Sequence, residues 1–437
     1  MSLEFNFKYV ARNRGPYTAF LDRYERTASH ARRSGAEAFQ MLCANLPSLI
    51  SDERNLIAAI DYLRSHGGGA AGVDGNRLID LGRIEAWGLA RDLRDRLCEG
   101  DYQRGPLLRC RFPKSGRPGV RTVYVANRDD RIVARAAVQI VVPLLEPFVA
   151  DGVQSWRRRG AQRALARAIV TTKAAGQRVW ITEDLRNAFD EVGRERLCQV
   201  LCHYMPNPEV CRWLVNFAAR PYKRGILQGS PLSPPFLDIY LTHFLHRPWN
   251  RKGGKARLQS YVDDLQLSCH TVEEAREAYD LLAQLIQSAG LHPKHGPDKA
   301  IADVGRQSVS WLGYRLRFAG DELNIRSEFF LPAGPERRRQ KHQRLVEKFA
   351  RLHDRPEGWR YADSIVRGIL NHLAPVSTEP SRQIYDQIRD AAAEAGFTEI
   401  IPFYDFTARW RTAHAQWQDS IAIRPHDRTD YVGFGAS

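Results

Sequence analysis

The segment that most constrains this chain is residues 255–270, where two adjacent carboxylates stand among alternating apolar residues. Asp263 and Asp264 form the centre of the segment. The apolar residues around them are Leu258, Val262, Leu265 and Leu267. This alternation predicts two short strands joined by a tight turn that carries both aspartates. Because neighbouring carboxylates repel each other, the pattern favours a bound divalent cation. The alternative is an acidic turn that is only solvated.

The charge balance of the chain indicates a polyanionic partner. Its 437 residues include 65 Lys and Arg against 50 Asp and Glu, which gives a formal net charge of +15. A globular chain this basic usually meets nucleic acid, and the alternative is a generally basic surface. The length suggests two or three domains.

Other features of the composition favour a cytoplasmic protein. The chain has no run of 18 apolar residues, so no membrane span is expected, and its first residues lack the apolar core of a signal peptide. Seven cysteines without a Cys-x-x-Cys pair predict reduced thiols. Cys198, Cys202 and His203 are close in sequence, but zinc would need a fourth ligand that the sequence does not show.

Periodicity and turn residues predict a chain of mixed helices and strands. Helices are expected within residues 1–66, 128–148, 194–220, 272–289 and from 335 onward. Strands are expected within 102–125 around a turn at 113–119, at 178–184, at 309–316, and in a segment that holds Lys294 and Lys299. A Gly, Pro and Ser-rich loop at 225–236 opens a further helix, which runs to about residue 246.

Three basic clusters are candidates for phosphate contact, and for the first and the third the alternative is a solvated basic surface. The first, in the turn at 113–119 and the strand after it, is Lys114, Arg117 and Arg121. The second is Arg157, Arg158 and Arg159 beside Trp156, because an aromatic ring next to arginines suits stacking and phosphate contact. The third is Arg337, Lys341 and Arg344, which share one side of the helix expected after Pro335.

Five features in a fixed order carry a resemblance to a known family. They are a strand ending at Asp184, the loop Gln228-Gly-Ser-Pro-Leu-Ser-Pro234, the hairpin Tyr261-Val-Asp-Asp264, a downstream lysine, and the strand Trp311-Leu-Gly-Tyr314. In this order they resemble a bacterial reverse transcriptase of the group II intron-like lineage. Ala71-Gly-Val-Asp-Gly75 and the segment from Pro113 to Arg121 extend the resemblance upstream, so that it covers residues 70–320.

The resemblance implies an α+β right-hand polymerase fold with fingers, an antiparallel-sheet palm and a helical thumb. The domains expected from it are a helical N-terminal extension at 1–70, fingers at 71–175, a palm with part of the fingers at 176–322, and a helical thumb and tail at 323–437. The polar, glycine-rich tail after residue 420 is expected to fray.

The resemblance also implies the roles of the site residues. Asp184, Asp263 and Asp264 would be catalytic and, with Leu185, would bind two Mg²⁺ ions, Mn²⁺ being the alternative. The residues implied to bind nucleotide are Lys114, Arg121, Phe189, Gln228, Gly229 and Lys299, with Lys294 as a competitor for the last position. Phe189 would exclude a ribose 2′-hydroxyl and so favour dNTPs, the alternative being simple core packing.

The function expected from the resemblance is RNA-directed DNA polymerase activity, that of a nucleotidyltransferase which copies an RNA template into cDNA. A stand-alone, defence-associated enzyme copying a dedicated non-coding RNA is the leading expectation, because nothing after the expected thumb resembles the DNA-binding or endonuclease regions of intron enzymes. The alternatives are an intron maturase-type or CRISPR-associated reverse transcriptase, and a catalytically silent, polymerase-like RNA-binding protein. The primer could be an RNA end, a DNA end or a protein hydroxyl. A second copy of the chain or an accessory protein is a further expected partner.

Overall fold

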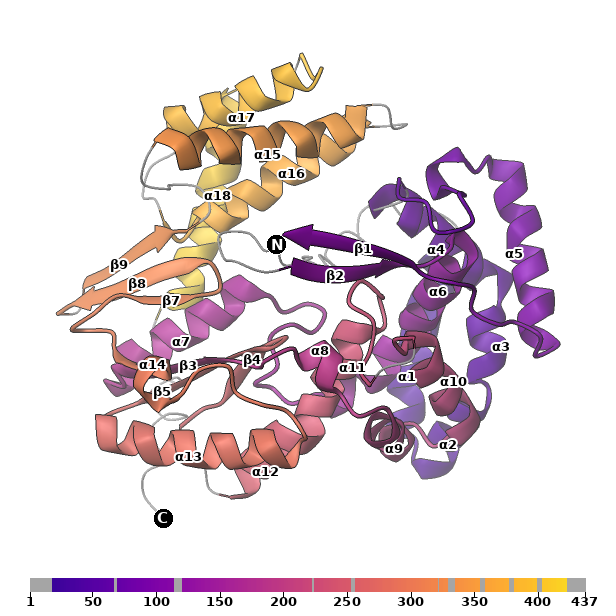
Figure 1. Cartoon of the computed structure of the whole chain (residues 1–437), viewed down its shortest axis with the longest axis horizontal. Helices are drawn as coiled ribbons and strands as arrows, with labels where there is room; N and C mark the ends of the chain where they lie inside the picture. Colours follow the sequence, from indigo (N-terminus) through magenta and orange to yellow (C-terminus); the bar gives the residue numbers. More distant parts are fainter. Residues whose placement is uncertain are drawn as a thin grey trace. The chain divides into compact units, whose positions relative to one another are not determined.

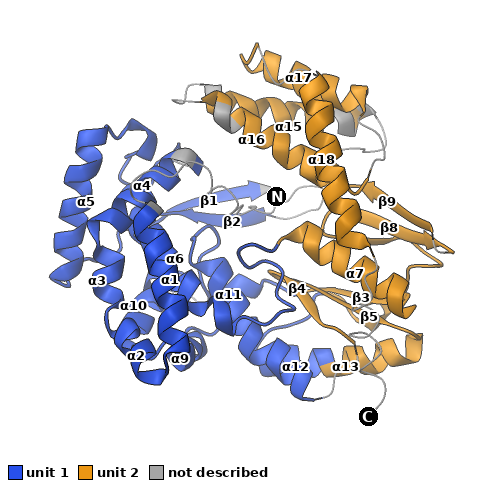
Figure 2. Cartoon of the chain, turned by 180° about the vertical axis from the view of Figure 1, so that it is seen from behind, with its two compact units in different colours: residues 1–159, 185–253, 282–294 blue, residues 160–184, 254–281, 295–437 orange. Residues whose placement is uncertain are grey.

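The computed structural model describes most of the chain. The described residues are 18–66, 69–113, 120–221, 224–252, 256–320, 322–328, 335–353, 358–376, 381–398 and 403–422. They form two compact units, each assembled from separate segments (Figure 2). Unit 1 takes the described residues within 1–159, 185–253 and 282–294, and unit 2 takes those within 160–184, 254–281 and 295–437. Because these segments interleave, neither unit corresponds to a single one of the four expected domains, whose boundaries stay predictions.

The described residues are rich in helices and form three small antiparallel sheets, as expected for an α+β protein. Among the helices of the described segments, none combines the length and the apolar character that crossing a membrane requires.

The described part of unit 1 begins with helices, which confirms the prediction for residues 18–66, whereas residues 1–17 lie outside the described ones. They are α1 (Thr18–Arg33), α2 (Ala36–Ala44), α3 (Leu46–Ser51), α4 (Glu53–His66), the 3₁₀ turn η2 (Leu78–Asp80), α5 (Arg83–Cys98), α6 (Arg128–Leu145) and the 3₁₀ turn η3 (Glu146–Phe148). Nearly every side chain of α6 is buried. Its Gln139 donates a hydrogen bond of 2.8 Å to Asn55 of α4, which pairs two buried polar side chains in this helical core.

The rest of unit 1 carries a two-stranded ribbon and a second helical group. The ribbon pairs β1 (Leu108–Pro113) with β2 (Val120–Val125), and the turn expected at 113–119 lies almost entirely outside the described residues. The helices are α8 (Ala188–Glu191), α9 (Arg194–Tyr204), α10 (Pro208–Ala218), α11 (Ser233–Leu241), the π-helical turn η4 (Thr242–His246) and α12 (Arg247–Arg251). This confirms that the loop at 225–236 opens a helix.

Unit 2 contains a four-stranded antiparallel sheet in the order β4-β5-β3-β6. Its strands are β3 (Val179–Asp184), β4 (Gln259–Tyr261), β5 (Asp264–Cys269) and β6 (Ile301–Asp303). Helix α7 (Ala161–Ala175) covers one face, and residues 272–281, the first part of α13 (Val272–Ser288), cover the other (Figure 1). Trp180 of β3 is fully buried and donates a 2.8 Å hydrogen bond to Thr172 of α7, which fixes the helix to the sheet.

A second, three-stranded sheet of unit 2 follows the first along the chain. Its strands are β7 (Val309–Trp311), β8 (Tyr314–Ala319) and β9 (Glu322–Ser327), in that order. The prediction of a single strand at 309–316 is therefore wrong, because Leu312 and Gly313 form a two-residue turn with φ of +49° and +80°. The strand-like prediction around Lys294 and Lys299 is also wrong. Lys299 belongs to the short helix α14 (Pro297–Ala300), and Lys294 lies in the preceding loop.

Helices complete unit 2, which confirms the helical prediction after residue 335. They are α15 (Pro335–His353), α16 (Gly358–Leu373), α17 (Arg382–Glu394) and α18 (Phe403–Ile421). Their shared core includes Phe349, Val366 and Phe406. The expected fraying of the tail concerns residues that, from 423 onward, lie outside the described ones.

Candidate active site

The pairing of β3 with β5 brings two of the predicted catalytic aspartates together in unit 2. Asp184, the last residue of β3, is directly opposite Asp264, the first residue of β5. Side chains directly opposite each other on antiparallel strands share one face, with Cβ atoms about 4.5–5.5 Å apart. Like charges in such a pair destabilise the sheet. The fold therefore holds two carboxylates together at the end of the sheet despite their repulsion.

The third aspartate lies in the turn between β4 and β5. Tyr261 pairs with Asp264, which leaves Val262 and Asp263 as a two-residue loop. Val262 has a φ of +58°, a conformation that is rare for a β-branched residue. Strain of this kind costs of order 1–3 kcal/mol and is found mainly at functional sites. The prediction of two short strands and a tight turn here is confirmed, and all three aspartates are half-buried.

A buried carboxylate behind the aspartate pair is a residue that the sequence analysis did not single out. Glu183 precedes Asp184 and points to the opposite face, because side chains alternate along a strand. One of its oxygens accepts hydrogen bonds of 2.9 Å from the main-chain N–H groups of Asp184 and His295. The other accepts a 2.8 Å bond from the hydroxyl of Tyr279 in α13. Glu183 is 3% exposed, so these bonds anchor the end of β3.

The pKa of Tyr279 is raised above its usual range, mainly because the side chain is buried and also because it donates a hydrogen bond to Glu183. The strand pattern could have revealed Glu183, since two consecutive acids in a strand cannot both face the same side. The pattern could not show that Tyr279 would donate a hydrogen bond to Glu183.

The donor set at this end of the sheet fits a hard cation in chemical type. Carboxylate oxygens are the ligands that Mg²⁺ prefers, and three aspartates supply only such oxygens. Leu185 has only its main-chain carbonyl to offer as a metal ligand, and its side chain is fully buried. Within the described segments, however, no three His, Cys, Asp or Glu side chains converge closely enough to form a metal site. The fit therefore rests on the opposed pair Asp184 and Asp264 and on the adjacent turn.

Phe189, predicted to bind nucleotide, lies in unit 1 on the single turn of α8. The main-chain carbonyl of Phe189 accepts a 2.8 Å hydrogen bond from the N–H of Ile226. Gly225 has a φ of +96°, and a Cβ atom there would lie 2.4 Å from the carbonyl oxygen of Asp190 and 2.5 Å from that of Phe189. Only glycine fits this close approach of two backbones. The segment at 225–226 thus supports the turn that presents a half-buried Phe189.

Gln228 and Gly229 lie against the ribbon of unit 1. The carbonyl of Gln228 accepts a 3.3 Å hydrogen bond from the N–H of Tyr124 in β2. A Cβ atom on Gly229, whose φ is +106°, would lie 3.0 Å from a methyl group of Val123. Arg121 is exposed near the start of the same strand, so three of the predicted nucleotide-binding residues are on or beside β2. Lys114 and Arg117 lie outside the described residues.

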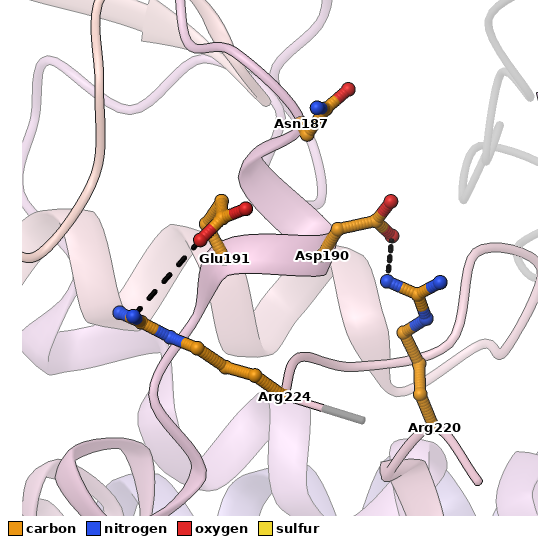
Figure 3. Close-up of a pocket in the computed structure, with 5 residues that line it drawn as sticks. All are labelled: Asn187, Asp190, Glu191, Arg220 and Arg224. Carbon is orange, nitrogen blue, oxygen red and sulfur yellow. Dashed lines mark ion pairs between the residues drawn. The ribbon is translucent and has the colours of Figure 1, made fainter. Parts of the chain in front are cut away.

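An open cavity of about 410 Å³ lies beside α8 in unit 1 (Figure 3). It is lined by Asn187, Asp190, Glu191, Arg220 and Arg224. Asp190 forms a 2.8 Å ion pair with Arg220, and Glu191 lies 4.0 Å from Arg224. Both acids of the cavity are therefore matched by arginines, which holds α8 to the segment that contains Gly225.

Of the three arginines at 157–159 predicted to bind nucleic acid, two bind other groups of the protein and one is largely exposed. Arg157 is 10% exposed and forms ion pairs with Glu25 and Glu146. Arg159 donates to the carbonyls of Ala150 and Val153. These two guanidinium groups hold the protein's own loop, whereas 68% of the Arg158 side chain is exposed.

The predicted contacts of unit 2 are mostly exposed. Lys299 and Arg344 are exposed, whereas the amino group of Lys341 donates a 2.6 Å bond to the carbonyl of Glu328. The side chain of Arg337 lies outside the described ones. Nucleic-acid binding by these residues stays a prediction.

A comparison with known families identifies the central part of the chain. No curated protein matches the sequence. Residues 112–316, a little under half of the chain, match the family model described as reverse transcriptase (RNA-dependent DNA polymerase). The matched segment includes Asp184, the hairpin with Asp263 and Asp264, and Gln228. The match supports RNA-directed DNA polymerase activity, that of a nucleotidyltransferase, for this part of the chain.

Proposed function

We propose that this protein copies RNA into DNA by two-metal nucleotidyl transfer at Asp184, Asp263 and Asp264. The observation that carries the proposal is the pairing of Asp184 directly opposite Asp264. Opposed like charges repel each other and by themselves destabilise a sheet. A cation bound between them removes that penalty.

The three aspartates, with the main-chain carbonyl of Leu185, would hold two Mg²⁺ ions, with Mn²⁺ as the alternative. When bound, the ions lower the pKa of the primer 3′-hydroxyl and neutralise charge on the triphosphate and the leaving pyrophosphate. The protein supplies the fixed positions of the carboxylates. Glu183 anchors the main chain of Asp184, and the strained turn at Val262 sets the direction of Asp263.

The nucleotide-binding residues take the roles that the resemblance to group II intron-like enzymes implies. Lys114, Arg121 and Lys299 would contact the triphosphate, because ammonium and guanidinium groups form strong hydrogen bonds to phosphate oxygens. Gln228 and Gly229 would line the pocket for the template and the nucleotide. Phe189 would exclude a 2′-hydroxyl, and its supported main chain suits that task, since a ring that discriminates by contact must not move. In this proposal the protein is a right-hand polymerase with fingers, palm and thumb.

The test is primer extension on an RNA template with Mg²⁺ and dNTPs. The wild type is expected to extend the primer, and Asp264→Asn to lose that activity while keeping its melting temperature. Asp280→Asn, which removes an exposed acid from α13, is the matched control and should extend normally. Normal extension by Asp264→Asn would overturn the assignment of the site.

Sugar selection provides a separate test of Phe189. Phe189→Ala is expected to incorporate rNTPs, because removal of the ring opens space for the 2′-hydroxyl. Tyr404→Ala removes another aromatic ring, 72% exposed in α18, and should leave the preference for dNTPs unchanged. If Phe189→Ala keeps the wild-type preference, the ring only packs.

The biological setting proposed is antiphage defence with a dedicated non-coding RNA as the template. The net charge of +15 supports a resident polyanion. Sequencing of the RNA and DNA that copurify with the protein tests this setting. One abundant RNA species together with its complementary DNA would support it. Recovery of intron RNA or of CRISPR-array sequences would favour the intron-type or CRISPR-associated enzyme instead.

A further inference from the structure

The three-stranded sheet of unit 2 has one buried face and one charged face. Along β8 the side chains alternate, so that Tyr314, Leu316 and Phe318 are buried while Arg315 and Arg317 are exposed. The buried face packs into a core that also contains Trp180 of β3 and residues of α7. We call the opposite side the arginine face. Its described members are Ser310, Arg315, Arg317, Ala319, Glu322, Asn324 and Arg326.

The register of the strands places like charges together on the arginine face. Arg315 of β8 is directly opposite Arg326 of β9, and Arg317 is two residues further along β8. Within the described part of the chain, none of these three arginines has an ion-pair partner. Glu322 is at the far end of the sheet opposite Ala319, and Glu328, just after β9, accepts a 2.6 Å hydrogen bond from Ser310.

The cross-strand arginine pair costs stability, as opposed like charges do, by about 0.2–1 kcal/mol relative to a neutral pair. An anionic ligand with several charges in a row would convert this cost into binding energy. Arginine suits a phosphodiester backbone in particular, because its planar fork can donate two parallel hydrogen bonds to phosphate oxygens.

We propose that the arginine face binds the phosphate backbone of base-paired RNA, outside the catalytic site. A paired stem is favoured over a single strand because the described members of the face include no aromatic side chain on which bases could stack. The arginine face is on the side of its sheet away from the core that contains Trp180 of β3, so the proposed stem lies apart from the strand that ends at Asp184. The proposed function enters only in the choice of RNA as the ligand.

The test measures binding of a fluorescent RNA hairpin that carries no primer, as a function of salt. Replacing Arg315, Arg317 and Arg326 together with Gln is expected to weaken binding of the hairpin. The slope of log affinity against log salt should become shallower by roughly two to three, because each phosphate contact releases counterions. The matched control replaces Arg91, Arg276 and Arg411, three exposed arginines on helices, and changes the net charge equally.

Three further readouts decide between a specific face and a general charge effect. Arg→Lys changes at the same three positions should keep most of the salt slope, which excludes misfolding as the cause. A single-stranded oligouridine should lose less affinity than the hairpin does. The variant should extend a primer on a short unstructured template at the wild-type rate. If the wild type itself does not extend the primer, the proposed polymerase function fails, whereas the proposal for the arginine face is still tested by hairpin binding. Equal losses in the helix control and the sheet variant, or no loss in the sheet variant, would overturn the proposal.

Discussion

The two described sheets of unit 2 each hold a pair of like charges directly opposite each other, acidic in one sheet and basic in the other. In the four-stranded sheet the pair is Asp184 and Asp264, and in the three-stranded sheet it is Arg315 and Arg326. The acid pair is half-buried at the end of its strands, with a strained turn beside it and Glu183 anchored behind it. The arginine pair is exposed on strands whose other face is a packed core.

In our proposals, this difference corresponds to two kinds of ligand. Short carboxylates on an anchored strand end have few rotamers, and a small hard cation needs such fixed oxygens. Long arginines on an open face keep their freedom and can follow an extended polyanion. In both proposals a ligand of opposite charge offsets the repulsion. In one sheet it is a cation held by fixed carboxylates, and in the other it is a polyanion contacted by mobile arginines.

The two charge pairs should differ most when each is neutralised in turn. Replacing Asp184 and Asp264 with Asn should reduce primer extension at least about a thousand-fold, which corresponds to about 4 kcal/mol of transition-state stabilisation. The free energy of unfolding should stay equal or rise by about 0.2–1 kcal/mol, because the repulsion is removed. Replacing Arg315 and Arg326 with Gln should leave extension of a short template unchanged. Similar extension rates in the two variants would show that the sheets do not differ in this way.

Metal binding gives the next largest effect and needs no turnover. At ten times its Kd, a single Mg²⁺ ion should stabilise the wild type by about 1.4 kcal/mol, because it binds the folded state alone. Calorimetry with increasing Mg²⁺ measures this as a rise in Tm. The rise should disappear in the variant with Asn at 184 and 264 and persist in the variant with Gln at 315 and 326. A rise that persists in the Asn variant would place the ion elsewhere.

The acid hairpin and the arginine sheet were not equally accessible to sequence reasoning. The turn at Val262 and Asp263 could be predicted because its signal is local: apolar alternation that stops at two acids. That Asp184 belongs beside them came only from resemblance, since β3 and β5 are separated by some eighty residues of helices and loops. The cross-strand partner of a residue is set by tertiary packing, which no local window contains.

Two misses follow from the same limit. Residues 309–316 were expected as one strand, although their apolar alternation changes phase at Leu312 and Gly313, where the chain reverses. Because the sheet was then expected as a single strand, the eleven-residue separation of Arg315 from Arg326 could not be recognised as a direct contact across β8 and β9. The sequence likewise shows that residue 183 is an acid. Its role in anchoring β3 could not be predicted, because it depends on a hydrogen bond from Tyr279, nearly a hundred residues away.

The turns beside the two sheets offer a third, smaller test. Val262 and Leu312 both have positive φ, which costs a side-chain-bearing residue about 1–2 kcal/mol each. Val262→Gly should raise the free energy of unfolding by about 0.5–1 kcal/mol, after allowance for the entropy that glycine loses on folding. Leu312→Gly should instead lower it by about 1 kcal/mol, since Leu312 packs against the core that contains Trp180. Chemical denaturation measures both values, and equal signs would mean that strain does not distinguish the two turns.

The smallest expected effect is a charge reversal that uses the register of the arginine sheet. Arg326→Glu places a carboxylate directly opposite Arg315, so a repulsive pair becomes an attractive one. The free energy of unfolding should rise by about 0.2–1 kcal/mol at low salt and return toward the wild-type value at high salt, because exposed charges are screened. Arg317→Glu is the matched control, since its cross-strand partner is Asn324 and no repulsion is relieved. Both reversals should weaken binding of the RNA hairpin, whereas only the first should stabilise the fold. If Arg317→Glu stabilises the protein as much as Arg326→Glu does, the gain comes from lower net charge, and the opposed arginines carry no special cost.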